Sequence, residues 1–373
     1  MTAPAPAPGT AQAAPLLAVE SLDVVLGRGW RANQVLSGVD LAIEPGEIVG
    51  LVGETGSGKT TLARTVAGLV SPAGGRVVFE GTTTSALRRG ARRAERRRGH
   101  LQLVFQDPLR SLDPDMTVAD IVAEGVRLQG ETGRDEIRRR VVAALGQVGL
   151  DDSVLSRTPG QISGGQRQRV SIARALATEP RLLICDEPVS ALDASNRNYI
   201  LRLLDQLRAS LGLSIVIISH DLSSLAGIAD RVVVLYRGRI VEDGPVDRVF
   251  AAPEHPYTAL LMASAPSVRH DRELSPQQLT RTVAEAGALP EALLAGLGGP
   301  DACVFATRCA FAAAPCAAQP PLVPAGDRRS VACHRHTEWM TLARARAADR
   351  ITGHTTGRSP DRGPGRTTEG QLA

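Results

Sequence analysis

The fold of this chain is decided by the stretch Gly53-Glu54-Thr55-Gly56-Ser57-Gly58-Lys59-Thr60-Thr61, which fits the pattern G-x-x-x-x-G-K-[ST]. It stands between an expected strand at Ile48–Gly53 and an expected helix at Thr60–Leu69, which is the context of a phosphate-binding loop. Glycines let backbone N–H groups converge on phosphate oxygens, and the N-terminus of the following helix attracts the anion. We expect Lys59 to reach the β- and γ-phosphates and Thr60 to offer its hydroxyl to Mg²⁺. The sequence therefore predicts a site for a nucleoside triphosphate.

The composition indicates a globular protein without membrane-spanning helices. Of the 373 residues, 43% are hydrophobic and 22% are charged, which is typical of a globular protein. No apolar run reaches the roughly 18 residues that a membrane-spanning helix needs. The Ala- and Pro-rich residues 1–15 lack the features of a signal peptide and are expected to be a disordered tail. We therefore expect the chain to be cytosolic. Any attachment to a membrane would be made through a partner protein.

Apolar runs of strand length alternate with helical patterns in the rest of the chain. Strands are expected at Leu182–Cys185, Leu213–Ser219 and Arg231–Tyr236. Strands separated by helical segments indicate an α/β architecture with a parallel sheet. The strands expected at Leu16–Leu26 and Gln34–Ile43 add an antiparallel β layer.

Turn and helix signals complete this outline. Arg237–Gly238 predicts a two-residue hairpin, with glycine where φ is positive. Thr117–Gln147 is rich in helix formers and is expected to be a helical insertion between two strands of the core sheet. We place a nucleotide-binding domain at residues 16–265 and a helical subdomain within it at about residues 107–178.

Two adjacent acids, Asp186 and Glu187, end the strand that begins at Leu182. At the end of such a strand, Asp186 is expected beside the phosphate loop, where it can hold Mg²⁺ through water. Glu187 can accept a proton from the attacking water. The pair, together with the phosphate loop, predicts hydrolysis of the triphosphate.

Further motifs resemble those of one ATPase family, the ABC-type ATPases. Ile162-Ser163-Gly164-Gly165-Gln166 resembles the family's signature motif, and Gln106 resembles its Q-loop. Ser190-Ala191-Leu192-Asp193 resembles the D-loop, and His220 resembles the switch histidine. The resemblance covers Leu16 to about Pro266 with the motifs in the family's order. It implies an α/β fold with a RecA-like core, an antiparallel β layer and a helical subdomain.

The same resemblance implies a catalytic arrangement. Two such subunits face each other head to tail and enclose two ATP molecules, with Ser163, Gly164 and Gly165 of each capping the γ-phosphate held by the other. His220 would orient the γ-phosphate and water, and Gln106 would sense Mg²⁺ and contact a membrane partner. The predicted catalytic residues are Glu187, His220 and Lys59, and the predicted Mg²⁺ site comprises Thr60, Gln106 and Asp186. The predicted nucleotide-binding residues are Gly53, Glu54, Thr55, Gly56, Ser57, Gly58, Lys59, Thr60, Thr61, Gln106, Ser163, Gly164, Gly165, Gln166 and Asp193.

One part of the ATP site is left open by the sequence. The family stacks an aromatic residue of the first strands on adenine, but the equivalent position here is near Leu26, and Trp30 is the only aromatic residue close to it. Trp30 is as well suited to stack on the base as to pack within a loop.

Other segments resemble the oligopeptide/dipeptide/nickel importers within this family. They are the Q-loop segment Val104–Pro114, the segment Pro253–Leu261, and the four cysteines Cys303, Cys309, Cys316 and Cys333. This likeness implies a subunit at the cytoplasmic face of the membrane that energises uptake of peptides, nickel or metal chelates. Its partners would be a second ATPase subunit, identical or paralogous, two permease subunits and an extracytoplasmic binding protein.

The four cysteines lie in a predicted C-terminal extension at residues 266–338, before an expected disordered tail at 339–373. Cytosolic proteins rarely use such a group for disulfides. A [4Fe–4S] cluster, a zinc ion and free thiols all remain open, with His334 and His336 as further candidate ligands. Cys185 is expected to be a buried strand residue.

The alternative function is that of an ABC ATPase acting on nucleic acid or ribosomes. The run Arg88–Arg98 is the one feature that favours it. No aromatic residue is interleaved there for base stacking, so we expect a solvated helix face or loop and no nucleic-acid partner.

Overall fold

The computed structural model describes residues 14–346, apart from 191, 223, 265–273, 283–284, 286, 288–289 and 327. Most of the two expected tails, 1–15 and 339–373, lies outside the described residues. In the part of the chain that the structure describes, no helix is both long enough and apolar enough to cross a membrane.

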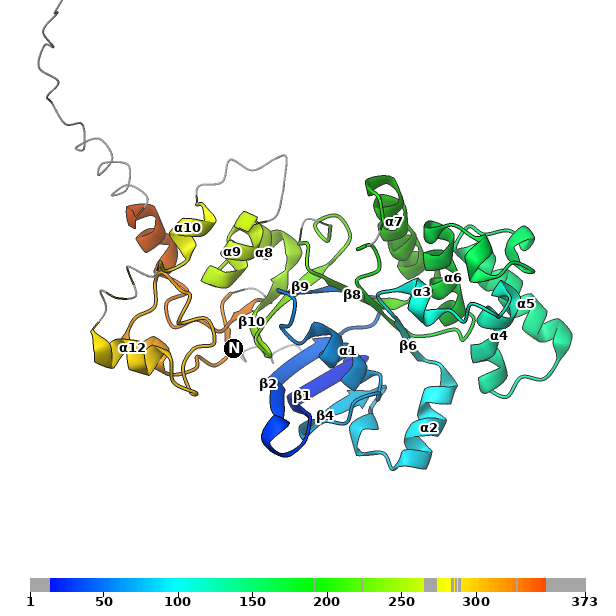
Figure 1. Ribbon diagram of the computed structural model, residues 1–373, viewed down its shortest axis with the longest axis horizontal. Coiled ribbons are helices and arrows are strands. Elements are labelled where there is room, and N and C mark those ends of the chain that lie inside the picture. The colour runs from blue at the N-terminus through cyan, green and yellow to red at the C-terminus, as the bar shows by residue number, and fades with distance from the viewer. Residues whose placement is uncertain are drawn as a thin grey trace, which may run out of the picture.

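An eight-stranded sheet forms the centre of the molecule, in the order β11-β12-β10-β9-β3-β8-β7-β6 (Figure 1). The five strands from β9 to β6 are parallel. The sequence predicted a parallel sheet and four of these strands, but not β6. Arg237 and Gly238, with φ of 44° and 78°, make the predicted hairpin turn into β10. The strands of this sheet are β3 Ile48–Val52, β6 Leu101–Val104, β7 Leu182–Asp186, β8 Ser214–Ser219, β9 Arg231–Tyr236, β10 Arg239–Pro245, β11 Val323–Pro324 and β12 Ser330–Val331.

The expected antiparallel layer is a second sheet with the order β2-β1-β4-β5. Its strands are β1 Leu17–Leu26, β2 Asn33–Ile43, β4 Gly74–Phe79 and β5 Thr82–Thr83. It packs on one face of the central sheet together with helix α1, Lys59–Val66. Alternate side chains of β3 point to opposite faces, so Val49 and Leu51 join this layer while Ile48 and Val52 join the helical side.

The predicted helical insertion follows β6 at one edge of the central sheet (Figure 1). The expected helix at Thr117–Gln147 is two helices, α4 Val118–Leu128 and α5 Arg134–Gln147. The break follows Gln129, where Gly130 takes a φ of 102° that no helix continues. The other helices before the extension are α2 Arg89–Arg98, α3 Pro108–Ser111, α6 Gly164–Leu176, α7 Ala194–Leu211 and α8 Val246–Ala251. The 3₁₀ turns are η1 Gly29–Arg31, η2 Thr84–Ala86, η3 Asp152–Val154, η4 Pro159–Gln161 and η5 Ala314–Ala317.

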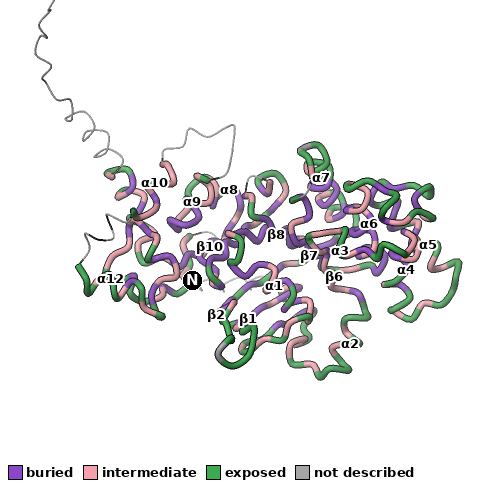
Figure 2. Tube along the Cα trace, viewed as in Figure 1, coloured by how far each residue is buried: buried purple, intermediate pink, exposed green. Residues whose placement is uncertain are grey.

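The C-terminal extension joins the opposite edge of the central sheet. Its strand β12 pairs with β10 through Glu242 and Val331, so the extension shares the sheet of the nucleotide-binding domain. Helix α9, Pro256–Ser264, comes just before the extension, which contains α10 Pro276–Leu279 and α12 Glu291–Leu297. Figure 2 shows buried chain running from the core into this region.

One domain boundary differs from the expectation. Trp339 was expected to begin a disordered tail, but it is fully buried and starts a helical segment at residues 339–346. Its indole Nε1 donates a hydrogen bond to the carbonyl oxygen of Glu254 at 2.7 Å, and its ring packs on Phe311. The Arg- and Thr-rich residues that follow Trp339 led to the expectation of disorder. The contact of Trp339 with Glu254 depends on tertiary packing, which composition does not indicate.

Candidate functional site

The phosphate loop connects the end of β3 to the start of α1. Gly53 and Gly58 have φ of 156° and 109°, and a Cβ atom on Gly53 would lie 2.1 Å from the carbonyl oxygen of Leu235. The close approach of β9 therefore requires glycine at position 53. The Nζ atom of Lys59 donates to the carbonyl oxygens of Gly53 and Glu54 at 2.7 and 2.9 Å, which curls the loop around the ammonium.

Burial sets the electrostatics of this loop. Desolvation lowers the pKa of Lys59, while the neighbouring carboxylates of Glu187, Asp186 and Glu54 raise it. Desolvation also raises the pKa of Asp186, at the end of β7, and the hydroxyl of Thr60 donates to its Oδ1 at 3.2 Å. A partly desolvated ammonium fits a phosphate anion, and a partly desolvated carboxylate beside a hydroxyl fits Mg²⁺. The residues present thus suit Mg²⁺ with a triphosphate.

Glu187 lies next to two other predicted site residues, Gln106 and His220. Its backbone has φ of 48°, a left-handed conformation, and its N–H donates to the carbonyl oxygen of Ile218 on β8. The amide of Gln106 donates to Glu187 Oε2 at 2.7 Å, and His220 Nδ1 lies 3.4 Å from Oε1. Tertiary structure therefore brings the candidate base, Q-loop glutamine and switch histidine together.

A cavity of about 390 Å³ opens over the loop. Leu26 and Val35 lie at one side of it, and Gln106, Glu187 and His220 at the other. Sequence reasoning missed Val35, whose only signal is its place near the start of the second strand. Leu26 is 39% exposed, while the side chain of Trp30 lies outside the described residues. The remaining residues around the cavity are Thr55, Gly56, Gly58, Lys59, Thr60 and Thr61.

The signature and D-loop residues are absent from the described lining of this cavity. Ser163 begins α6 in a capping box, in which its Oγ accepts from the N–H of Gln166 and Gln166 Oε1 accepts from the N–H of Ser163. Asp193 begins α7 and accepts from the N–H of Asn196 at 2.9 Å. Ser163 and Gly164 are exposed. Their contact with nucleotide stays a prediction.

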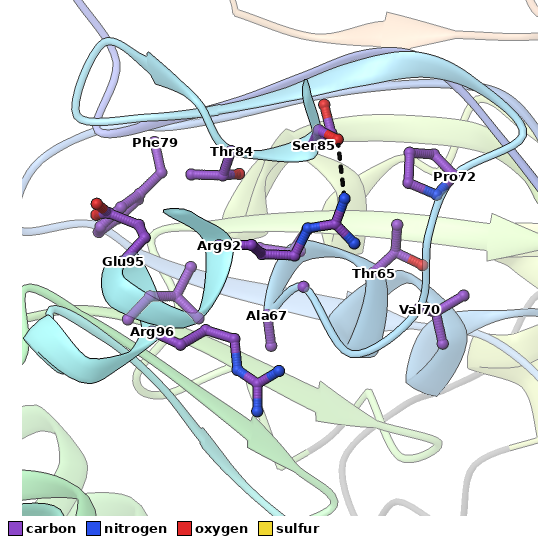
Figure 3. Close-up of a pocket in the computed structure, with 13 residues that line it drawn as sticks. Thr65, Ala67, Val70, Pro72, Phe79, Thr84, Ser85, Arg92, Glu95 and Arg96 are labelled. Carbon is purple, nitrogen blue, oxygen red and sulfur yellow. Dashed lines mark hydrogen bonds between the residues drawn. The ribbon is translucent and has the colours of Figure 1, made fainter. Parts of the chain in front are cut away.

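The arginine-rich run forms α2, as a solvated helix with no buried residue. Arg92 is half-buried, and its guanidinium donates to Ser71 Oγ and to the carbonyl oxygens of Ser85 and Leu87. Figure 3 shows the bond to Ser85. These bonds hold α2 against η2 and against the segment before β4, beside a cavity of about 40 Å³. At least one member of the run thus has a structural role.

The four cysteines of the extension line one small cavity of about 20 Å³. All are free thiols, and burial raises the pKa of Cys309 and Cys333 to about 12. Among the residues that the structure describes, no group of three or more His, Cys, Asp or Glu side chains is arranged to hold a metal ion. The four side chains share one cavity, but metal binding by them stays a prediction. The buried Cys185 on β7 is the strand residue expected.

Known proteins share both parts of this architecture. Residues 36–190 match the family described as ABC transporter, and residues 241–316 match the oligopeptide/dipeptide transporter, C-terminal region. The oligopeptide transport ATP-binding protein OppF of Escherichia coli (strain K12) is 42% identical over 313 residues, covering 82% of this chain and 91% of that protein. The protein of the same name from Salmonella typhimurium is 40% identical, covering 83% and 92%.

Two solved structures of ATP-binding cassettes are similar to this chain in fold. A dimeric, post-hydrolysis structure of the ATP-binding cassette MJ0796 bound to ADP and Pi has a TM-score of 0.57 and 29% identity, covering 62% of this chain and 98% of that chain. CbiO1 from Clostridium perfringens, part of the ABC transporter complex cbiONQ, also has a TM-score of 0.57, with 31% identity over 66% of this chain and 95% of its own. The chain therefore belongs to the ABC transporter ATP-binding proteins of the oligopeptide/dipeptide importer family and is an ABC ATPase.

Proposed function

We propose that this chain hydrolyses ATP to energise the import of peptides or related small solutes through separate permease subunits. The observation that supports this most is the link between the catalytic base and a surface groove. Gln106 holds Glu187 in the nucleotide cavity, and its neighbour Phe105 lines a groove of about 470 Å³. A partner in that groove would thus act on the chain next to the residue that holds the base.

The groove has the chemistry of a protein-binding site. Leu69 and Leu128, which line it, are 45% and 54% exposed, and Arg93, Arg96 and Arg97 line it as well. Apolar side chains surrounded by charged ones mark surfaces that bind other proteins. We assign the groove to a cytoplasmic segment of the permease, which places this subunit peripherally at the cytoplasmic face of the membrane.

A second ATPase subunit would complete the nucleotide site. At the exposed N-terminus of α6, which Ser163 caps, the backbone N–H groups of Gly164 and Gly165 are suited to an anion. Placed against the cavity of another subunit, these groups would cap the γ-phosphate. Closure with ATP and opening after hydrolysis would then drive the permease between two states. An extracytoplasmic binding protein would deliver the solute.

Within the site, each residue has a defined task in this proposal. Lys59 and the loop N–H groups would hold the phosphates. Thr60 and Asp186 would hold Mg²⁺, which would neutralise charge on the phosphates. Glu187 accepts a proton from the attacking water, while His220 and Gln106 position the base and the water.

The groove provides the test of the transport function. Leu128→Glu should abolish co-purification with the permease subunits in detergent and abolish peptide uptake, while the isolated chain still binds ATP. Leu211→Glu is the matched control, because Leu211 is 47% exposed on α7 and does not line the groove. Recovery of ribosomes or nucleic acid with the wild-type chain, and of no permease, would overturn the proposal.

For the cysteine cavity, we propose a [4Fe–4S] cluster as the occupant. The support is the donor set, because four thiols on one cavity suit a thiophilic group. The cluster would crosslink segments of the extension, and its binding requires the buried thiols to lose their protons. A brown anaerobic preparation with four iron atoms per chain, lost in Cys309→Ser, is expected. Stoichiometric zinc, or four thiols that titrate freely without metal, would refute it.

A further inference from the structure

An arginine of the C-terminal extension reaches the phosphate loop. Arg308 Nη1 donates to both carboxylate oxygens of Glu54, at 2.9 and 3.1 Å, and to the hydroxyl of Tyr236 at 3.3 Å. Glu54 is the second residue of the loop, 254 positions earlier in the chain. The motifs of the nucleotide site do not include Arg308, and the ATPase mechanism above does not use it.

The backbone of Glu54 is held from the same side. Its N–H donates to the hydroxyl of Tyr257 at 2.8 Å, and Tyr257 is fully buried on α9. The rings of Tyr236 and Tyr257 are 4.3 Å apart and both pack on Phe305. Both the side chain and the amide of one loop residue are thus held by an aromatic cluster that spans β9, α9 and the extension.

The position of Arg308 is fixed by its own segment. Its N–H donates to the carbonyl oxygen of Phe305 at 3.0 Å, and its carbonyl oxygen accepts from the N–H of Arg281 at 2.8 Å. Its guanidinium lies 5.7 Å from the ring centre of Phe305 and 5.8 Å from that of Tyr236. A side chain held at both ends in this way is suited to hold a loop in one conformation.

The charge of Glu54 gives this contact a consequence for ATP. A carboxylate within the phosphate loop repels the phosphates that the loop binds, and it also acts electrostatically on Lys59. Arg308 offsets that charge through its hydrogen bonds to both carboxylate oxygens. We propose that Arg308 is a positioning residue of the ATPase, which raises affinity for ATP by pairing with Glu54. The C-terminal extension then forms part of the nucleotide site.

The expected effect is modest because the pair is partly exposed, with side-chain exposures of 39% and 41%. For such ion pairs a loss of about three- to fivefold in ATP affinity is appropriate. The ATP dissociation constant of the full chain, measured with Mg²⁺ present, should rise by this factor in Arg308→Ala. The KM for ATP should rise in proportion, and kcat should stay close to that of the wild type. Arg308→Lys, which keeps the charge, should restore the affinity to within about twofold.

Two comparisons separate positioning from general damage. In a Glu54→Gln background, Arg308→Ala should have little further effect on ATP affinity, because the charge it offsets is gone. Arg281→Ala is the control, since it removes an arginine of the same extension whose guanidinium donates to the carbonyl oxygen of Ala312. An Arg308→Ala variant with wild-type affinity would overturn the proposal. Equal losses in both Glu54 backgrounds, or a fall in kcat and thermal midpoint with unchanged KM, would overturn it as well. The ATP dissociation constant needs only ATP, Mg²⁺ and the isolated chain, so this part of the test is independent of the transport function.

Discussion

The side-chain amide of Gln106 donates a hydrogen bond to the carboxylate of Glu187 at 2.7 Å. The two residues follow different strands, β6 and β7, which pair in parallel from Leu101 and Leu182 onward. Parallel pairing brings the carboxyl ends of both strands to one edge of the sheet, so the two side chains meet there. The bond occupies one oxygen of the candidate base and leaves the other toward His220.

The first prediction concerns that base. Glu187→Gln keeps the shape and can still pair with Gln106, but it cannot accept a proton from water. Turnover of ATP should fall by about 10²-fold or more, with ATP retained in a stable dimer. Hydrolysis at the wild-type rate in a single-turnover assay would disprove the role of Glu187.

The second prediction concerns the only lysine in the chain. Lys59 is 5% exposed, and its ammonium is enclosed by the carbonyl oxygens of Gly53 and Glu54. The broader guanidinium of Lys59→Arg does not fit this enclosure, so ATP hydrolysis should fall by at least about tenfold. The control is Arg202→Lys on the exposed side of α7, which should hydrolyse ATP normally. Normal turnover in Lys59→Arg would mean that the loop lysine has another role.

The third prediction concerns Mg²⁺ and pH. Burial raises the pKa of Asp186, and Mg²⁺ binds only the ionised carboxylate. The Mg²⁺ concentration that half-activates ATP hydrolysis should therefore rise as pH falls through that raised pKa. Asp186→Asn should need about tenfold more Mg²⁺ at pH 7.5 and should lose most of this pH dependence. An Asp186→Asn variant with the wild-type requirement for Mg²⁺ would contradict the assignment.

The fourth prediction concerns stability in acid. His255 is fully buried beside the cysteine cavity, and burial lowers its pKa to about 3. Its Nδ1 accepts a hydrogen bond from the N–H of Tyr257, which requires the neutral ring. The unfolded chain takes up a proton below pH 6.5 that the folded chain does not, so stability is complete above that pH and falls as pH decreases toward 3.

At pH 5.5 this difference costs about 1.4 kcal/mol of the free energy of unfolding. Denaturant unfolding at pH 5.5 and 7.5 should show the loss in the wild type and a smaller one in His255→Asn, whose amide oxygen can accept the same bond. His334→Asn is the control, because His334 is exposed. Equal pH dependence in the wild type and His255→Asn would refute the prediction.

Much of this protein is determined by local sequence. The phosphate loop, the turn at Arg237–Gly238 and the strand end at Asp186 follow from steric and hydrogen-bonding rules that act over a few residues. The motifs then lie at the carboxyl ends of strands because a parallel sheet places them there. The break between α4 and α5 is also local, and the glycine at position 130 was its signal.

Contacts between segments that are distant in the chain could not be predicted from local sequence. The pairing of β12 with β10, the burial of Trp339 and the approach of Arg308 to Glu54 depend on how the extension packs against the core. A surface arginine and a paired arginine look alike in the sequence, because an ion pair depends on distance in space and leaves no periodic pattern. The sequence by itself thus determined the ATP chemistry and the class of fold. Tertiary structure alone decided which residues of the extension hold the phosphate loop, since only packing brings chain segments 254 positions apart into contact.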